Sequence, residues 1–357
     1  MIISRTPFRV SFFGGGTDYP GWYREHGGAV LATTIDKYCY LTCRFLPPFF
    51  EHKFRIIYSK IENCMTVDDI RHPSAREVIR YLGIDRGLEI HHDADLPARS
   101  GLGSSSAFTV GLLHALYALQ GTMVSKKELT REAIFIEQEI LRETVGSQDQ
   151  ASTAHGGLNL ITFPASGELV VTPVAVNSAR VQELNDHLML FYTGIKRTAE
   201  MVANSYVGSI GSKDRQLLLM KDLTEQALKI LNTGVDLKGF GELLHEAWDA
   251  KRSLSAEVSN SEVDDIYETA RRAGATGGKL LGAGGGGFFL LFAPPERHAA
   301  IREVLRGLIF VPFRFDFGGS QVIFMDREQD YLDVERGTAS ERRFRELDAA
   351  RDPATDF

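Results

Sequence analysis

The stretch Pro97-Ala-Arg-Ser-Gly-Leu-Gly-Ser-Ser-Ser-Ala-Phe-Thr-Val-Gly111 decides how this chain is interpreted. A hydroxyl-rich loop runs into a helix, expected at Ser106–Leu119, whose residues are apolar almost all round. The first turn of a helix has unpaired N–H groups and the positive end of the helix dipole, so it attracts anions. Gly101 and Gly103 let the backbone approach a ligand closely. The pattern indicates a phosphate-binding loop, with a serine-capped buried helix after a turn as the structural alternative.

Composition sets the class of protein. The chain has 357 residues, 43% hydrophobic and 24% charged, enough for one large or two medium domains. A net charge of −7 argues against nucleic-acid partners, so an anionic substrate requires a local cluster of Arg or Lys. Three cysteines are too few for a disulfide framework and indicate a reducing cytoplasm. Because no signal-peptide pattern or membrane-length apolar run is present, we expect a cytoplasmic protein without membrane association.

Strand-like and helix-like patterns are mixed without strict alternation, which favours an α+β, two-lobed molecule. We expect one lobe at residues 1–185, a second at 186–335 and a charged tail at 336–357. The main expected strands are Val10–Phe13, Ala29–Thr34, Tyr38–Phe45, Phe54–Tyr58, Leu88–His92, Leu188–Tyr192, Phe288–Phe292, Phe310–Asp316 and Gln321–Met325. The expected helices include Lys127–Arg142, Arg215–Leu231, Gly239–Leu254 and Glu262–Ala273.

A second polar segment follows the first strand, where Gly14-Gly15-Gly16-Thr17-Asp18 ends the run that begins at Pro7. The glycines hold a carboxylate in a loop whose backbone can touch a ligand. Asp18 can accept hydrogen bonds from sugar hydroxyls, and Arg9 can neutralise a phosphate. An Asx-type turn after a strand is the alternative explanation.

The helix expected at Lys127–Arg142 places one carboxylate on its apolar face, that of Glu137. Such a group is expensive to bury unless it is paired or bound to a metal, so Glu137 is a candidate functional residue and a structural salt bridge is the alternative. Glu139 is rotated from it by about 200°. We expect Glu139 on the solvent side, together with Glu132 and Glu143.

Asp149 follows a glycine-opened turn between Gln148 and Gln150, where a carboxylate can accept a substrate proton or orient a hydroxyl. Lys196 and Arg197 form a basic pair after a strand. A solvated turn is the ordinary interpretation of that pair, and a site for a second phosphate is the functional one.

The glycine-rich segment 277–287 contains Gly282, Gly284 and Gly287 in the spacing of a dinucleotide fingerprint. A strand, Phe288–Phe292, follows it instead of a helix, so we reject a dinucleotide fold. Close packing of this backbone against another loop or a ligand explains so many glycines better.

Together these segments resemble the GHMP kinase superfamily. Its three ordered motifs match Pro7-Phe-Arg-Val10 with the glycines after it, Gly101-Leu-Gly-Ser-Ser105 and the glycines at 282–287, and Gln148-Asp149-Gln150 lies in register with them. Within the superfamily the pattern is similar to bacterial D-glycero-D-manno-heptose 7-phosphate kinases, and L-fucose kinases share much of it.

The resemblance implies a ribosomal-protein-like N-terminal α/β lobe and a ferredoxin-like C-terminal lobe, with ATP and sugar between them. It implies Mg²⁺ bound by Ser105 and Glu137, and Asp149 and Arg9 as catalytic residues. Relatives often carry Glu-His where this chain has Gly15-Gly16, which changes the sugar side of the site. The residues expected to bind ATP phosphates are Arg99, Ser100, Gly101, Leu102, Gly103, Ser104, Ser105, Ser106, Gly284 and Gly285. Those expected to bind the acceptor are Gly15, Gly16, Thr17, Asp18, Asp149, Lys196 and Arg197, with Arg99 a further candidate for its phosphate.

The function implied is an ATP-dependent kinase that acts on the anomeric hydroxyl of heptose 7-phosphate, for the synthesis of nucleotide-activated heptose. A kinase of a non-phosphorylated sugar, such as fucose or galactose, is one alternative. A non-catalytic metabolite-binding relative is the other, and the presence of Ser105, Glu137 and Asp149 together argues against it. The expected partners are ATP and a sugar phosphate, and the expected assembly is a monomer or a homodimer.

Overall fold

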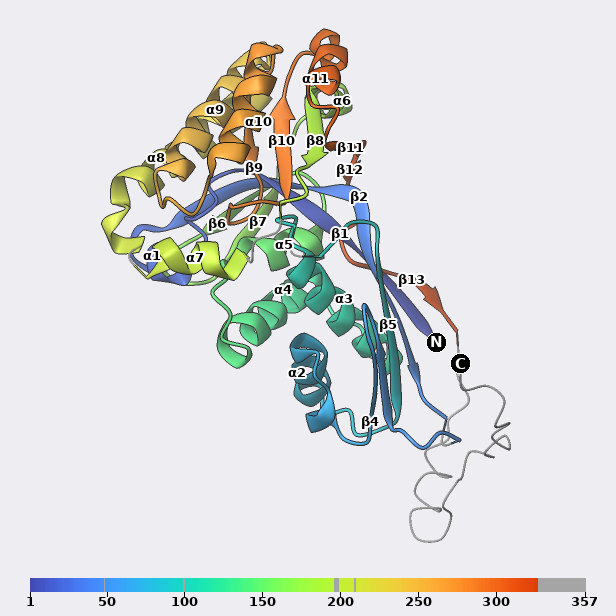
Figure 1. Cartoon of the computed structure of the whole chain (residues 1–357). Coiled ribbons are helices and arrows are strands. Elements are labelled where there is room, and N and C mark those ends of the chain that lie inside the picture. Colours follow the sequence, from blue (N-terminus) through green and yellow to red (C-terminus); the bar gives the residue numbers. More distant parts are fainter. Residues whose placement is uncertain (48, 99, 196–198, 209, 327–357) are drawn as a thin grey trace.

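Two β-sheets organise the part of the chain that the computed structural model describes, residues 1–47, 49–98, 100–195, 199–208 and 210–326 (Figure 1). The first sheet has the order β13-β1-β2-β5-β3-β4, and β6, β7 and β12 join it through β2. Only β3 and β5 pair in parallel within it. Its strands are β1 Ile2–Phe13, β2 Gly28–Phe45, β3 Phe54–Ile57, β4 Ile61–Cys64, β5 Leu88–Ala94, β6 Asn159–Phe163, β7 Val170–Pro173, β12 Phe315–Asp316 and β13 Gln321–Met325.

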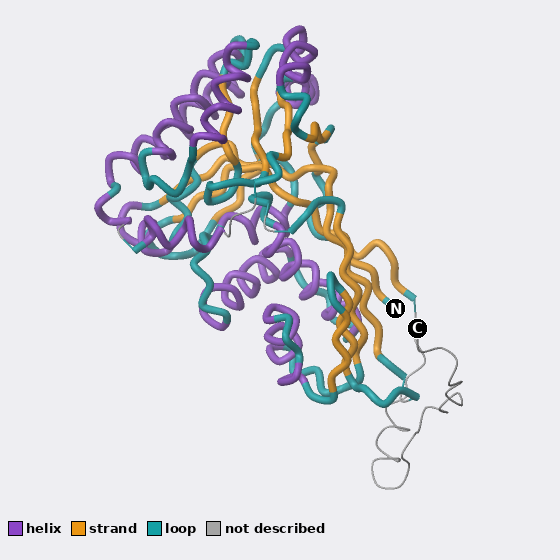
Figure 2. Tube along the Cα trace, viewed as in Figure 1, coloured by secondary structure: helices purple, strands orange, loops and turns teal. Residues whose placement is uncertain are grey.

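Helices cover one face of this first sheet (Figures 1 and 2). The central one, α3 (Ser104–Leu119), has every residue from Ser106 to Leu113 buried, because the sheet lies on one side of it and other helices on the other. Its all-round apolar composition follows from that position, since each large side chain buried there contributes about 1.5–3 kcal/mol. The neighbouring helices are α2 (Pro73–Tyr81), α4 (Lys126–Phe135) and α5 (Gln148–His155).

The second sheet has the order β11-β8-β10-β9 and is antiparallel throughout. Three helices, α8 (Asp214–Thr233), α9 (Lys238–Arg252) and α10 (Ser261–Arg272), lie along one side of it (Figure 1). Its strands are β8 Leu188–Tyr192, β9 Gly277–Leu280, β10 Phe288–Phe292 and β11 Ile309–Val311. Short helices complete the fold at α1 Pro20–His26, α6 Ser178–Asp186, α7 Ala199–Val207 and α11 His298–Val304.

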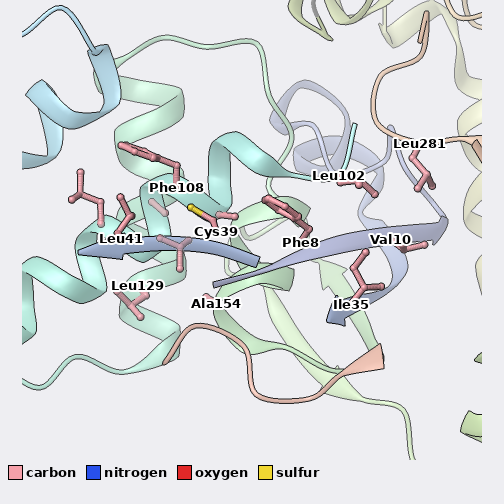
Figure 3. Packing of buried hydrophobic residues seen from close by; sticks show 14 of the residues in the cluster. Phe8, Val10, Ile35, Cys39, Leu41, Leu102, Phe108, Leu129, Ala154 and Leu281 are labelled. Carbon is pink, nitrogen blue, oxygen red and sulfur yellow. The ribbon is translucent and has the colours of Figure 1, made fainter. Parts of the chain in front are cut away.

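Strand β10 joins the two hydrophobic cores. Side chains alternate between the faces of a strand, so Phe288 packs into the cluster around β1 and α3, whereas Phe289 stacks on Tyr267 and meets Trp248 in the second cluster. Figure 3 shows the first cluster, in which Leu102 and Leu281 lie near Val10. Each of these two leucines belongs to one of the glycine-containing segments, so burying them anchors both segments to β1.

Several expected elements differ from the observed ones. A single long strand, β2, replaces the two strands expected at Ala29–Thr34 and Tyr38–Phe45, with a register shift against β1 opposite the gap between them. Strands β12 and β13 pair with the first sheet, although the sequence assigned them to the second lobe. The residue ranges given for the lobes stay a prediction, but the pairing shows that the chain returns to the first sheet after completing the second. The helices α1, α2, α5, α6 and α7 and the strands β4 and β9 were not predicted.

Candidate active site

The loop before α3 has the backbone geometry that its glycines predict. Gly101 and Gly103 both have left-handed φ values, 83° and 74°, and Gly103 is the N-cap of α3. The helix therefore begins at Ser104, two residues earlier than expected. Gly103 has no side chain with which to cap the helix, so the first turn retains N–H groups suited to binding an anion.

The two glycine-containing segments pack backbone against backbone. A Cβ atom at Gly101 would lie 2.5 Å from the carbonyl oxygen of Leu281, and one at Gly282 would lie 2.5 Å from the Cα of Gly101. A Cβ at Gly287 would lie 2.3 Å from the carbonyl oxygen of Ser100. Close backbone packing, inferred above from the number of glycines, is thus confirmed. It fixes the phosphate-loop candidate against β9 and β10.

Arg9 and Asp149 form a two-point ion pair at this junction. The Nε and Nη2 atoms of Arg9 donate to the two carboxylate oxygens of Asp149, each at 2.7 Å. Nη1 donates to the carbonyl oxygen of Gly101 at 2.6 Å. Arg9 is buried, whereas the Asp149 side chain keeps 25% of its surface exposed, in the first turn of α5. The pair fixes the orientation of an accessible carboxylate beside the head of α3.

Asp18 ties the triple-glycine turn to the start of α5. Its carboxylate accepts hydrogen bonds from the backbone N–H of Gly16 (2.9 Å) and of Gln148 (3.3 Å), and its own carbonyl accepts from Ser147 (3.0 Å). Complete burial raises the pKa of Asp18, and the negative charge of Asp149 raises it further. Thr17 is also buried, and its hydroxyl donates to the backbone carbonyl of Gly14 in the same turn (2.7 Å) and to that of Ala29 on β2 (3.1 Å).

Glu137 lies in a π-helical turn, Ile136–Ile140, that continues α4. Its side chain is fully buried, as predicted, and Glu139 is exposed. One carboxylate oxygen accepts hydrogen bonds from Ser106 (2.9 Å) and from Gln150. The other, Oε1, has no hydrogen-bond partner among the described residues. Burial raises the pKa of Glu137 to about 7.

Two residues near Glu137 differ from expectation. Glu132, expected on the solvent side, is buried instead, because the Tyr117 hydroxyl donates to its carboxylate at 2.8 Å and satisfies it there. Ser105, expected to share a metal with Glu137, is exposed in the first turn of α3, and the neighbouring Ser106 makes the contact with Glu137. The role of Ser105 stays a prediction.

Two buried lysines, Lys251 and Lys279, complete the junction, and the sequence interpretation gave neither a role. Lys279, on β9, donates to the carbonyl of Phe12 on β1 at 2.8 Å. Lys251 donates to the carbonyls of Leu280 (2.9 Å) and Gly282. Burial, together with nearby positive charge, lowers the pKa of Lys279 to about 7 and lowers that of Lys251 well below its usual range.

Helical spacing could have identified Lys251, because it falls on the buried face of α9 with Leu244 and Trp248. This is the same reasoning that singles out Glu137.

Three predicted site residues, Arg99, Lys196 and Arg197, lie outside the described residues. Their described neighbours Ser100 and Ile195 both contact Gly287. Gly284 and Gly285 pack against Val258, whose carbonyl accepts from the N–H of Gly285 at 2.9 Å.

Within the described ranges there is no group of three or more His, Cys, Asp or Glu side chains arranged to hold a metal. No helix in those ranges is both long enough and apolar enough to cross a bilayer.

Two family models match the chain, GHMP kinases N terminal domain over residues 71–157 and GHMP kinases C terminal over residues 227–308. A mevalonate kinase from Methanothermobacter thermautotrophicus is 31% identical over 240 residues, which are 60% of this chain and 71% of that protein. The chain belongs to the GHMP kinase family. This GHMP kinase is an ATP-dependent phosphotransferase with an alcohol group as acceptor.

Two other similarities cover nearly the whole molecule. A D-glycero-alpha-D-manno-heptose 7-phosphate kinase from Campylobacter jejuni is 28% identical over 316 residues, 85% of this GHMP kinase and 93% of that protein. The crystal structure of a D-glycero-D-manno-heptose 1-phosphate kinase from Bacteroides thetaiotaomicron superposes with a TM-score of 0.75 at 23% identity, covering 92% of this chain and 100% of that one. The second similarity confirms the two-lobed fold predicted from the motifs.

Proposed function

We propose that this GHMP kinase transfers the γ-phosphoryl group of ATP to the anomeric hydroxyl of D-glycero-D-manno-heptose 7-phosphate, giving the 1,7-bisphosphate. The observation that carries the proposal is the Arg9–Asp149 pair, which holds an accessible carboxylate at the head of α3. The similarity to the Campylobacter jejuni kinase over almost its full length supports the choice of acceptor.

Asp149 is the proposed catalytic carboxylate. Phosphoryl transfer needs in-line positioning and neutralisation of spreading negative charge more than covalent chemistry. In this proposal Asp149 receives the proton of the acceptor hydroxyl, or holds that hydroxyl in line. Arg9 orients Asp149 and offers positive charge to the transferring group. The N–H groups and hydroxyls between Ser100 and Ser106, at the positive end of the α3 dipole, bind the ATP phosphates.

Glu137 fits a divalent cation, because its buried Oε1 lacks a partner in the described part of the chain. Carboxylate and hydroxyl oxygens suit Mg²⁺, which keeps several waters and binds through few protein groups. Glu137 and Ser105 are the residues that would hold Mg²⁺. When bound, the ion would neutralise charge at the β- and γ-phosphates.

Ser105→Ala should lower the apparent affinity for Mg²⁺ in the kinase reaction. Ser106→Ala removes the hydroxyl that donates to Glu137. Comparing it with Ser105→Ala separates the positioning of Glu137 from direct binding of the metal by Ser105.

The acceptor site is proposed at the triple-glycine turn. The Asp18 carboxylate accepts hydrogen bonds from two backbone N–H groups, and its remaining lone pairs can accept from a sugar hydroxyl. Gly15, Gly16 and Thr17 form the backbone of this side of the site. The phosphate already on the acceptor needs a cationic clamp, for which Lys196, Arg197 and Arg99 are the candidates.

A substrate panel tests the proposal. Heptose 7-phosphate, free L-fucose and free galactose are compared with ATP and Mg²⁺ in a coupled assay that detects ADP, and ³¹P NMR locates the new phosphate. We expect turnover of heptose 7-phosphate with a second phosphate at the anomeric carbon. Turnover of only a free sugar would select the fucose- or galactose-type alternative. Turnover of no sugar would contradict the proposed acceptor class.

The clamp has its own test. Lys196→Ala and Arg197→Ala should raise the KM for heptose 7-phosphate and leave the KM for ATP unchanged. Lys238→Ala is the control, since Lys238 is an exposed lysine of α9 whose side chain lies 3.6 Å from the exposed Glu242. An effect confined to the KM for ATP would show that the pair serves the nucleotide.

A further inference from the structure

Two buried lysines fasten the end of β9 to its surroundings. Lys251, on α9, is 6% exposed, and Lys279, on β9 itself, is 3% exposed. The ammonium group of Lys251 donates to the backbone carbonyls of Leu280 (2.9 Å) and Gly282. The ammonium group of Lys279 donates to the carbonyl of Phe12 on β1 at 2.8 Å. One lysine therefore holds the turn after β9 to α9, and the other holds β9 to β1.

The turn that Lys251 holds supports the phosphate-loop candidate. Leu281 lies between the two residues whose carbonyls accept from Lys251, and its side chain is buried near Val10 (Figure 3). A Cβ at Gly101 would lie 2.5 Å from the carbonyl oxygen of Leu281, so the loop rests directly on this turn. Loosening the turn would therefore loosen the backbone that is proposed to bind the ATP phosphates.

Lys279 supports the other side of the site. Its acceptor, Phe12, lies on β1 three residues after Arg9. The charges of Arg9 and Asp18 both act on the Lys279 ammonium group. Because Arg9 orients Asp149, the placement of β1 against β9 determines where that carboxylate stands.

Holding a turn does not by itself call for buried ammonium groups. A charged group loses its hydration on burial, and apolar side chains of similar volume often serve a core as well or better. No other buried residue of α9 is polar. The positive charges of Lys279 and Arg9 act on Lys251 and add to the cost of burying it. The location of the two lysines, one behind the phosphate loop and one behind the ion pair, indicates a use in the reaction.

We propose that Lys251 and Lys279 are positioning residues for phosphoryl transfer, Lys251 for the phosphate loop and Lys279 for the Arg9–Asp149 pair. Neither touches a substrate, and both act through backbone carbonyls. Such an effect matters because in-line transfer depends on the placement of the catalytic carboxylate relative to the γ-phosphate. The inference rests on the proposed function in taking the loop before α3 as the phosphate site and Asp149 as the catalytic carboxylate. It does not depend on which sugar is the acceptor.

Lys251→Met and Lys279→Met test the two roles, since methionine is also unbranched and has no hydrogen-bond donor. Calorimetry with Mg²⁺ and without sugar measures the Kd for ATP. Initial rates at saturating ATP measure kcat with whichever sugar of the panel the wild-type protein phosphorylates.

The two variants should differ in which quantity changes. In Lys251→Met the Kd for ATP should rise at least about fivefold, because two hydrogen bonds from a charged donor are lost behind the loop. Its kcat should fall by less than about threefold, because bound phosphates hold the loop in place once ATP saturates it. In Lys279→Met kcat should fall at least about tenfold, because Asp149 is displaced from the line of transfer. The Kd for ATP should stay within about twofold of the wild-type value there.

Lys126→Met is the matched control. Lys126 is another partly buried lysine that donates to two backbone carbonyls, those of His155 (2.8 Å) and Gly318 (2.7 Å). These residues lie at the end of α5 away from Asp149 and between β12 and β13. Its loss should lower the thermal stability and leave the Kd for ATP and kcat unchanged. Thermal unfolding checks that every variant folds, and Lys251→Gln or Lys279→Gln replaces a methionine variant that does not.

Unchanged Kd in Lys251→Met together with unchanged kcat in Lys279→Met would overturn the inference, because the lysines would then serve stability alone, as Lys126 does. Equal changes in both quantities in both variants would overturn it too, by removing the division between the two sides of the site. If the wild-type protein phosphorylates no sugar, the proposed acceptor class fails. The Kd of Lys251→Met then still tests its role, and the rate of ATP hydrolysis by water replaces kcat for Lys279→Met.

Discussion

Replacing Glu137 with glutamine separates the cost of burying a charge from the use proposed for that charge. In the folded, metal-free protein the pKa of Glu137 is about 7, mainly because its side chain is fully buried, and its ordinary value is 4.5. Between these two pH values the folded state keeps a proton that the unfolded state has lost. The free energy of unfolding must therefore fall as pH rises from about 4.5 to 7, and the loss is complete above pH 7.

The size of the effect follows from the same values. A rise in pKa from 4.5 to about 7 corresponds to about 3 kcal/mol of destabilisation at pH 8. Solvent does not screen it, because no part of the side chain is exposed. The amide that replaces the carboxylate in Glu137→Gln would keep an acceptor for Ser106, but its N–H would face the unpartnered side, which costs about 1–2 kcal/mol. The net expectation for this variant is a gain of about 1–2 kcal/mol at pH 8 in chelator, and no gain at pH 5.

Urea unfolding of the metal-free protein at pH 5 and pH 8 measures this difference. Glu139→Gln is the matched control, since Glu139 lies in the same π-helical turn but is exposed. Added Mg²⁺ and ATP should stabilise the wild-type protein more than Glu137→Gln, whose kinase activity should fall at least about 100-fold. If Glu137→Gln is less stable than wild type at pH 8 in chelator, or if it matches Glu139→Gln there, the burial argument is wrong.

Three further predictions concern the same junction. Asp149→Asn should lower kcat by about 10²–10⁴, the range for a positioned base, with little change in ATP KM; near-normal turnover would remove Asp149 from its role. Because the pKa of Lys279 is about 7 when folded and 10.5 ordinarily, wild-type stability should gain from this group as pH rises from about 7 to 10.5. Urea unfolding at pH 7 and about 9.5 should show that Lys279→Met loses this gain, and an identical pH dependence would contradict the assignment. Gly287→Ala places a Cβ 2.3 Å from the carbonyl of Ser100 at a left-handed φ, so it should lower thermal stability and raise ATP KM, as unfolding and initial-rate assays can check.

The parts of the site that could be predicted depend on short-range patterns. Gly101 and Gly103 stand where the loop needs left-handed backbone, and three residues of sequence are enough to suggest it. Glu137 lies on the apolar stripe of one helix, so helical periodicity alone predicts its burial. The periodicity could not predict that Glu132 is buried as well, because the Tyr117 hydroxyl that satisfies it comes from a different helix.

The parts that could not be predicted depend on contacts between distant segments. Arg9 and Asp149 are 140 residues apart, and no local pattern indicates that one neutralises the other. Helix α5 is short, and its buried residues include the polar Gln148, Gln150, Ser152 and Thr153, so no apolar periodicity reveals it. Strand β13 consists of five residues whose pairing with β1 closes a loop of more than 300 residues.

Electrostatics at the junction shows why overall charge is a poor guide to this site. The chain carries a net charge of −7, yet Arg9, Lys251 and Lys279 are all buried at this junction. Asp149 pairs with Arg9, and the charge of Asp18 acts on Lys279. With all five groups ionised the cluster has one excess positive charge. Burial opposes that excess, which is why the pKa of each lysine is lowered. An incoming phosphate would reverse this effect, so binding of the anion should be accompanied by proton uptake near neutral pH.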